Sequence, residues 1–331
     1  MPGTLQTDLT RAADLLRAAT DVTLLAHVRP DADALGSALA LGLVLRRRGA
    51  RVRVSFADPA EPPEGLRGLD TEGLWVPPAT LPAGEGLLVV LDTASPARLG
   101  ALGGRVPAAV AAGVPVLVVD HHATNTRYGT HDVVDGTAEA TAVLVLRLID
   151  ELGAELDEPV ARCLYAGVMT DTSGFRRARP ATHHVAARLL AAGVDPDPLT
   201  RALVDDHPFA WLPMLGAVLA GARLDPAAAA GRGLVHAVVP AELVATVRLE
   251  EVESVIDVVR STREAEVAAV LKELEPGEWT VSLRAKEAVD VAAAARALGG
   301  GGHRLAAGCT VRGTADEVVA RIKAALAGVA G

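Results

Sequence analysis

The chain has 331 residues, of which half are hydrophobic and only 2% aromatic, and it carries a formal net charge of −9. This length suggests two ordinary domains or one large one. The acidity argues against a binder of long duplex nucleic acid, which presents a basic face, and the scarcity of aromatic rings argues against a grip on long single strands.

The two cysteines, Cys163 and Cys309, lie far apart in the sequence, so neither a disulfide framework nor a cysteine-based zinc site is expected. Residues 1–13 contain Asp8 and no apolar run, which argues against a signal peptide. No segment has the roughly twenty uninterrupted apolar residues of a membrane span. We therefore expect a soluble cytoplasmic protein that does not bind a membrane.

Strands and helices are predicted to alternate through the first 192 residues. Strands are predicted at 22–26, 51–57, 87–91 and 115–119. Helices are predicted at 34–48, 138–152, 159–168 and 182–192. Apolar runs that are bounded by turns and separated by helices are typical of a parallel sheet with both faces covered.

The composition changes at the segment 193–198, GVDPDP, after which a helical connector is predicted over 193–231. The remainder, 232–331, is predicted to form a smaller second domain. Its strands are expected at 233–239, 266–274 and 279–284, and its helices at 290–298 and 315–327. The expected fold class is therefore α/β, with a parallel-sheet domain over 1–192, a smaller C-terminal α/β domain, and a cleft between them.

Acids and imidazoles follow the predicted strands of the first domain. His27, Asp31 and Asp33 follow the first strand, Asp92 follows the third, and the triplet 120–122, DHH, follows the fourth. Asp171 comes after the apolar helix 159–168. Taken singly, each acid is explained as well by a helix cap or a solvated turn. Together they are more informative, because the carboxyl ends of parallel strands meet at the edge where such sheets bind ligands.

Six candidate metal ligands are present at these positions: His27, Asp31, Asp33, Asp92, His121 and Asp171. Carboxylates with some imidazole suit Mn²⁺ or Mg²⁺ better than a thiolate site does. A set of six allows two divalent ions, which sit roughly 3.5–4 Å apart when they share a bridging carboxylate.

In order, these motifs resemble those of the DHH phosphoesterases. The segment 27–37 matches HxxxDxD followed by GS, and the strand-end Asp92, the DHH triplet and the TDT of 170–172 come after it. The C-terminal stretch 299–308, GGGGHRLAAG, resembles the glycine-rich motif of the DHH-associated C-terminal domain. The resemblance covers nearly the whole chain. One departure is Ser173, where relatives usually have glycine.

The resemblance implies a role for each of these positions. One ion would be held by His27, Asp31 and Asp92, and a second by Asp33, Asp92, His121 and Asp171, so that Asp92 would bridge. His122 would lie over the substrate phosphate as a donor or acid, and Asp120 would orient its neighbours. Mn²⁺ is the expected metal, with Mg²⁺ as the alternative.

The C-terminal domain would bind the nucleotide portion of the substrate. Arg284 and Lys286 are predicted to share one side of a strand, and the glycine run brings backbone amides close to a ligand at Gly301 and Gly302, next to His303. Without the resemblance, a flexible loop and a solvated face explain these residues better. Arg98, six residues after Asp92, is a further candidate for phosphate contact.

The expected activity is hydrolysis of a phosphate ester in a very short RNA, a dinucleotide, or 3′-phosphoadenosine 5′-phosphate (PAP). A cyclic-dinucleotide phosphodiesterase, a manganese pyrophosphatase and a processive exonuclease of the RecJ type are the enzymatic alternatives. A nucleotide-sensing module without catalysis is the alternative of another class. The resemblance also makes a homodimer an open possibility.

Overall fold

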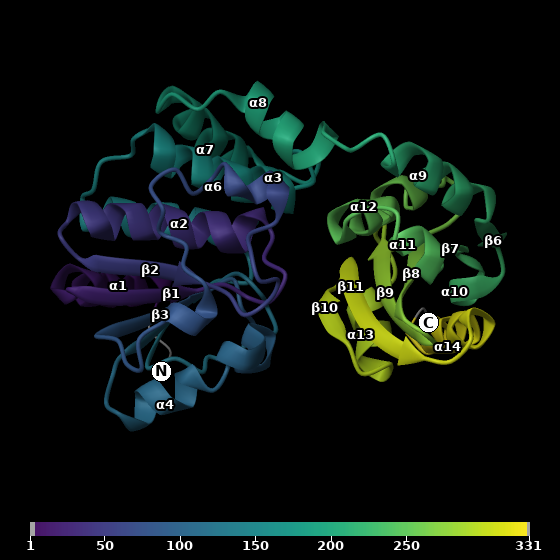
Figure 1. Ribbon diagram of the computed structural model, residues 1–331, viewed down its shortest axis with the longest axis horizontal. Coiled ribbons are helices and arrows are strands. Elements are labelled where there is room, and N and C mark those ends of the chain that lie inside the picture. The colour runs from purple at the N-terminus through teal and green to yellow at the C-terminus, as the bar shows by residue number, and fades with distance from the viewer. Residues whose placement is uncertain (1–3, 330–331) are drawn as a thin grey trace. The chain divides into compact units, whose positions relative to one another are not determined.

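The computed structural model describes residues 4–329, which divide after residue 206 into two compact units (Figure 1). The residues predicted as a connector are divided between both units. The N-terminal unit takes α8 (Pro196–Thr200) and the π-helical turn η3 (Arg201–Asp205), and the C-terminal unit takes α9 (Trp211–Ala220), β6 (Arg223–Asp225) and α10 (Ala228–Gly231).

The N-terminal unit is built on a five-stranded parallel sheet in the order β2-β1-β3-β4-β5. The strands are β1 (Asp21–Leu25), β2 (Arg51–Ser55), β3 (Leu87–Leu91), β4 (Val116–Asp120) and β5 (His131–Val134). Four of them were predicted, whereas β5 was not. The strand order reverses between β1 and β3, and the crevice at such a reversal is where open parallel sheets bind ligands.

Helices cover both faces of this sheet, as the sequence predicted. Leu24, Leu91 and Val119 face one layer, whereas their neighbours Leu25, Val90 and Val118 face the other, because successive strand side chains alternate. The first layer contains α1 (Leu5–Ala18), α2 (Ala32–Arg47), α5 (Thr141–Leu152) and α6 (Glu158–Asp171), and the second contains η2 (Pro96–Leu102) and α4 (Arg105–Ala111). The short helices α3 (Glu64–Arg67) and η1 (Pro78–Thr80) and the longer helix α7 (Pro180–Ala191) complete the unit.

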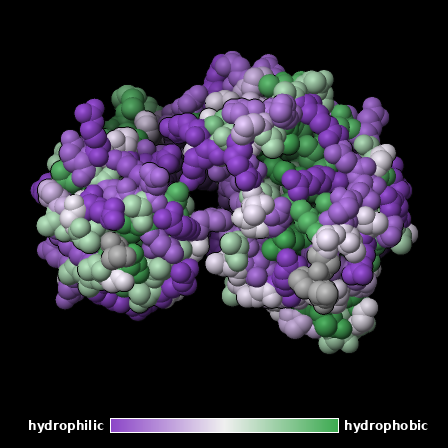
Figure 2. Space-filling model, turned by 180° about the vertical axis from the view of Figure 1, so that it is seen from behind, coloured by the Kyte–Doolittle hydropathy of each residue, from purple (hydrophilic) through white to green (hydrophobic). Residues whose placement is uncertain are grey.

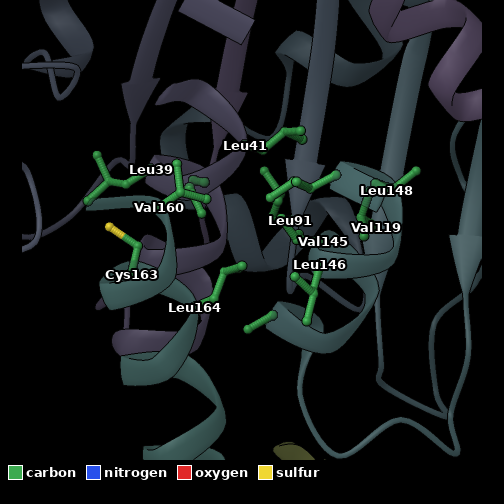
Figure 3. Packing of buried hydrophobic residues seen from close by; sticks show 14 of the residues in the cluster. Leu39, Leu41, Leu91, Val119, Val145, Leu146, Leu148, Val160, Cys163 and Leu164 are labelled. Atoms are coloured by element: carbon green, nitrogen blue, oxygen red, sulfur yellow. The ribbon is translucent and has the colours of Figure 1, made fainter. Parts of the chain in front are cut away.

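The core behind the sheet edge is tightly packed, as Figure 3 shows for side chains of α2, α5, α6 and the strands. Leu39, Leu91 and Leu164 are completely buried there. Truncating such a leucine to alanine costs roughly 2–5 kcal/mol. Gly36 permits α2 and α6 to approach each other closely, since a Cβ at this position would lie 2.4 Å from the carbonyl oxygen of Cys163 in α6. This packing fixes α2 and α6 against each other.

The C-terminal unit has a mixed six-stranded sheet in the order β10-β11-β9-β8-β7-β6, in which only the β7–β8 pair is parallel. Its further strands are β7 (Leu234–Val239), β8 (Val267–Glu275), β9 (Glu278–Ala285), β10 (Gly301–His303) and β11 (Ala306–Arg312). Its further helices are α11 (Ala241–Val244), α12 (Leu249–Val259), α13 (Val291–Ala297) and α14 (Ala315–Ala327).

The two faces of this second sheet differ. One is fully covered, because Val281, Leu283 and Cys309 pack with residues of α13 and α14. On the other, residues of α9 and α12 pack on β7 and β8, while the side chains of β9, β11 and β10 that share this face are only partly buried or exposed. The sheet therefore leaves part of one face accessible within the unit.

Figure 2 shows one side of each unit, on which hydrophilic residues are widely spread and smaller hydrophobic patches are interspersed among them. Across residues 4–329, no helix has both the length and the apolar character needed to cross a bilayer.

Candidate active site

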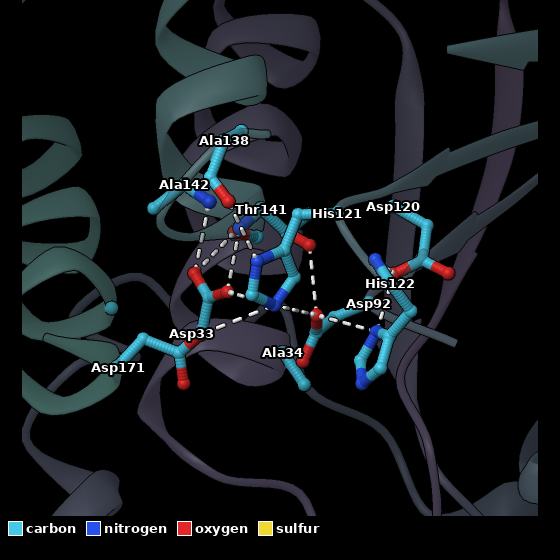
Figure 4. Close-up of polar contacts among 12 residues, drawn as sticks. Asp33, Ala34, Asp92, Asp120, His121, His122, Ala138, Thr141, Ala142 and Asp171 are labelled. Atoms are coloured by element: carbon cyan, nitrogen blue, oxygen red, sulfur yellow. Dashed lines mark hydrogen bonds and ion pairs between the residues drawn. The ribbon is translucent and has the colours of Figure 1, made fainter. Parts of the chain in front are cut away.

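Three strand-end loops and the end of one helix converge at the carboxyl edge of the N-terminal sheet (Figure 4). The loop after β1 supplies His27 and Asp31, and the first turn of α2 supplies Asp33. Asp92 directly follows β3, and the residues 120–122 lie at the end of β4 and just after it. Asp171 is the last residue of α6. All the metal-ligand candidates of this unit thus lie around the crevice where the strand order reverses.

Asp92 lies at the centre and turns its two carboxylate oxygens to different partners. Its Oδ2 is 3.6 Å from Nε2 of His27, and its Oδ1 is 3.5 Å from Nε2 of His121. Asp92 belongs to three groups of candidate ligand atoms that lie within 4.8 Å of one another, and one of these contains Asp120 and His122. The other two, whose remaining members are the ligand candidates of the sequence, are His27, Asp31 and Asp92, and Asp33, Asp92 and His121. Asp92 belongs to both groups, which is the arrangement of a bridging carboxylate. Its backbone has φ 53°, a left-handed conformation that aims the side chain.

The two histidines present the same ring nitrogen to these groups. Nδ1 of His27 lies 2.8 Å from the carbonyl oxygen of Val28, and Nδ1 of His121 lies 3.2 Å from that of Ala138. A carbonyl only accepts, so Nδ1 carries a proton in both rings, and Nε2 is the nitrogen that can bind a cation once it is deprotonated. Metal-binding histidines are oriented in this way by their other nitrogen.

The acids are held in place by backbone amides. Oδ1 of Asp31 accepts from the amides of Asp33 and Ala34 at 3.1 and 2.9 Å, so Asp31 caps α2 with one oxygen and turns Oδ2 toward His27 at 3.8 Å. Two amides of the first turn of this helix are thus taken by Asp31. Asp33 accepts from the amides of Thr141 and Ala142.

The electrostatics of the cluster favour added positive charge. Burial, followed by the nearby charges of Asp92 and Asp171, raises the pKa of Asp33 well above its usual range. Burial lowers the pKa of His27, but Asp31 and Asp92 outweigh it and raise the pKa to about 10. Buried carboxylates this close together are costly unless cations compensate them. Hard oxygen donors with two inward imidazole nitrogens suit a divalent cation, so the residues fit a metal centre.

Asp120 and His122 form a hydrogen-bonded pair beside Asp92. Nδ1 of His122 donates to Oδ1 of Asp120 at 2.6 Å, and the Oδ2 atom of Asp120 accepts from the side-chain amide of Asn125 at 2.6 Å. Asp120 is completely buried. Burial lowers the pKa of His122, but the hydrogen bond with Asp120 and the charge of Asp92 outweigh it and raise the pKa. Both oxygens of Asp120 thus contact side chains, one of His122 and one of Asn125.

Comparisons with known proteins identify the family. Residues 21–168 match the N-terminal domain of the DHH family and residues 236–329 match the DHHA1 domain. The chain is 35% identical over 309 residues to the "Bifunctional oligoribonuclease and PAP phosphatase NrnA" of Thermus thermophilus, covering 91% of this chain and 87% of that protein. The chain belongs to the DHH family of phosphoesterases.

Two solved structures share the fold. An exopolyphosphatase-related protein from Bacteroides fragilis superimposes with a TM-score of 0.86 at 22% identity, covering 97% of this chain and 96% of that one. The exonuclease RecJ bound to manganese superimposes with a TM-score of 0.52 at 19% identity, covering 97% and 94%. At these identities the likeness concerns the fold.

In this DHH-family chain the segment after Asp171 has an unusual backbone. Ser173, Gly174 and Phe175 all have positive φ, at 56°, 66° and 62°. Ser173, the departure from the family motif, has its hydroxyl 2.7 Å from a guanidinium nitrogen of Arg177. Glycine adopts this conformation without cost, whereas serine requires support. The Arg177 contact supplies such support.

Arg284 and His303 share the accessible face of the C-terminal sheet. Ala306 of β11 is paired with Arg284 of β9 on one side and with His303 of β10 on the other, and directly paired residues project to the same face. A Cβ added at Gly301 would have no neighbouring atom within 4 Å, so this position leaves open space. Gly302 is different, because a Cβ there would lie 2.6 Å from the carbonyl oxygen of Ala306 and its φ is 138°.

The two remaining candidates for substrate binding, Lys286 and Arg98, are not part of this sheet. Lys286 was expected beside Arg284, yet its Nζ donates to the carbonyl oxygens of Thr262 and Arg263 at 2.6 and 3.0 Å. The ammonium is thus engaged by the backbone beyond α12. Arg98 is exposed, and one of its guanidinium nitrogens lies 3.5 Å from Nδ1 of His27, at the rim of the metal centre.

Some residues of the site had no signal in the sequence. Thr141, Asn125 and the carbonyl of Ala138 contact Asp92, Asp120 and His121 respectively. A threonine that begins a helix and an asparagine in a loop are explained equally well by local capping. Only their three-dimensional partners distinguish them.

Proposed function

We propose that this chain is a phosphoesterase with two divalent cations that hydrolyses very short oligoribonucleotides to 5′-mononucleotides and PAP to AMP. The observation that supports it best is the position of Asp92, which turns one oxygen to His27 and the other to His121. The name of the Thermus thermophilus relative supports the choice of substrates. Manganese is the proposed metal, in line with the donor set and with the RecJ structure that is described as bound to manganese.

Two groups of side chains would hold the cations. His27, Asp31 and Asp92 form the first group, and Asp33, Asp92, His121 and Asp171 form the second. When bound, divalent cations neutralise charge on phosphate oxygens and activate water for in-line attack. The protein contributes preorganised donors, because both imidazoles and the carboxylates of Asp31 and Asp33 are already oriented by backbone partners.

His122 is proposed to contact the substrate phosphate and to supply a proton. Its Nδ1 is held by Asp120, and this contact keeps the imidazole protonated and fixed in direction. The Nε2 nitrogen is then the one that donates to a phosphate oxygen or to the leaving oxygen. Arg98, near His27, is proposed to contact the phosphate as well.

The accessible face of the C-terminal sheet is proposed to bind the nucleotide. Arg284 and His303 provide charge and hydrogen-bond donors on this face, and Gly301 leaves room for a ligand. Gly302 contributes by allowing β10 to approach β11 closely. We propose that Lys286 does not contact the nucleotide. Its role is to tie the end of β9 to the segment after α12.

The test is a substrate panel with the purified chain and with an Asp92→Asn variant as the control for contaminating nucleases. The substrates are PAP, an RNA dinucleotide, an RNA of about twenty nucleotides, a cyclic dinucleotide and pyrophosphate, each with Mn²⁺, with Mg²⁺ and with a chelator. We expect turnover of the dinucleotide and PAP that requires the metal and is absent in the variant. Turnover of the cyclic dinucleotide, pyrophosphate or the long RNA alone would contradict the proposed substrates. Binding of all five without turnover would indicate a nucleotide-sensing module.

A further inference from the structure

Thr141, the first residue of α5, contacts two of the acids of the candidate metal centre. Its hydroxyl donates to Oδ1 of Asp92 at 2.8 Å, and its backbone amide donates to Oδ2 of Asp33 at 2.6 Å. The amide of Ala142 donates to Oδ1 of Asp33 at 2.9 Å. Thr141 is completely buried, so these contacts are shielded from water and are visible in Figure 4.

The two acids come from different parts of the sheet edge and repel each other. Asp33 lies in the first turn of α2 and Asp92 lies at the end of β3. A single residue on a third element donates to both, and it therefore fixes the distance between them. Two of the three donors are backbone amides, which any residue provides. Only the hydroxyl depends on the side chain, and its partner is the oxygen of Asp92 that faces His121.

The carboxylate of Asp33 is confined from the other side as well. A Cβ at Gly167 of α6 would lie 2.6 Å from Oδ1 of Asp33 and 3.0 Å from its Cα. The start of α5 and the middle of α6 thus enclose Asp33 in one position. Asp92 is contacted instead by the Thr141 hydroxyl and by the imidazoles of His27 and His121.

We propose that Thr141 is a positioning residue, whose hydroxyl orients Asp92 toward the group formed by Asp33, Asp92 and His121 and so sets the affinity of this group for its cation. The inference rests on the proposed two-cation function. Partners of this kind, which contact a metal ligand and not the metal, typically change metal affinity by about 10–100-fold when removed. The effect should fall on one of the two cations, because Oδ2 of Asp92 faces the other group.

The experiment compares Thr141→Val, which removes the hydroxyl and keeps the shape, with Thr141→Ser, which keeps the hydroxyl. The matched control is Thr23→Val, an equally buried threonine on β1 whose hydroxyl has no hydrogen-bond partner among residues 4–329. Binding of Mn²⁺ is measured by calorimetry and by electron paramagnetic resonance, which detects coupling between two adjacent ions. Unfolding of each variant in a chelator checks that the fold is intact.

We expect Thr141→Val to weaken one of two Mn²⁺ steps by about 10-fold or more and to lose the coupled signal at low Mn²⁺, with recovery at high Mn²⁺. Thr141→Ser and Thr23→Val should bind as the unmodified chain does. If Thr141→Val does not fold, Thr141→Ala replaces it with the same expectation, and Thr141→Ser still tests the hydroxyl. Equal affinities for Thr141→Val and the unmodified chain would overturn this inference alone, and so would a Thr141→Ser variant as weak as Thr141→Val. An unmodified chain that binds no Mn²⁺ would overturn the proposed function as well.

Discussion

The Nε2 atom of His121 lies 3.1 Å from the Oδ2 atom of Asp171, and this contact joins the end of β4 to the end of α6. Burial lowers the pKa of His121, but the hydrogen bond with Asp171 and the charges of Asp92 and Asp33 outweigh it and raise the pKa to about 11. Asp171 thus lies on the His121 side of the candidate metal centre, at the end of a helix that packs beside the sheet. It contacts only this side, whereas Asp92 serves both.

That difference predicts unequal effects of removing the two acids. Asp92→Asn should reduce hydrolysis of PAP to background with the fold retained, because both cation groups lose a ligand. Asparagine is preferred to alanine, since the backbone φ of 53° is tolerated better by asparagine. Asp171→Asn should leave measurable activity that increases with added Mn²⁺. Steady-state assays over a Mn²⁺ series check both, and a fully active Asp92→Asn enzyme would exclude a bridging role.

Arg284 and Lys286 should differ in their effect on substrate binding. Arg284→Ala should mainly raise KM for PAP and for an RNA dinucleotide, because Arg284 lies on the accessible face with His303. Lys286→Ala is the matched control, since its ammonium is engaged by the carbonyls of Thr262 and Arg263. It should change KM little and lower the unfolding midpoint. Equal KM values for Arg284→Ala and the unmodified chain on both substrates would contradict the proposed surface.

A buried lysine provides a stability prediction in the C-terminal unit. Lys272 is 1% exposed and its Nζ pairs with Glu253 and donates to the hydroxyl of Ser282 at 2.8 Å. Glu253→Gln leaves the buried ammonium without its counter-charge and should destabilise the unit by about 2 kcal/mol. Lys272→Met keeps the volume and leaves a carboxylate that is 40% exposed to water, so its cost should stay within about 1 kcal/mol. Urea unfolding measures both. The opposite ranking would show that the ion pair does not hold the lysine in place.

The pair of Glu139 and Arg179 predicts a pH dependence. The hydrogen bond from Arg179 is the main cause that lowers the pKa of Glu139 from 4.5 to about 2. A lowered pKa means that the ionised carboxylate stabilises the fold fully above pH 4.5 and that this stabilisation is lost as the pH falls toward 2. Glu139→Gln should therefore lower the free energy of unfolding by about 1 kcal/mol at pH 7, since the pair is partly exposed. The difference from the unmodified chain should shrink at pH 3. A difference that is constant over this range would count against the ion pair.

The sequence by itself determined the parallel sheet of the N-terminal unit and the position of its site. Apolar runs ended at His27, Asp92 and Asp120, and parallel strands place their carboxyl ends at one edge, so convergence of these residues followed from the strand pattern alone. The strand β11 and the helix α12 were not predicted. β11 begins with two alanines and a glycine, which disfavour a strand, and five of the eleven residues of α12 are β-branched, which disfavours a helix.

Only the tertiary structure decided how the acids are held. The contact of Thr141 with Asp92 and Asp33, and the glycine of α6 that encloses Asp33, depend on helices that pack beside the sheet edge. The tie of Lys286 to the segment after α12 has the same origin. Such partners are distant in the chain and are fixed by the packing of whole elements, whereas the periodicity of a sequence reports only which side chains a single element buries.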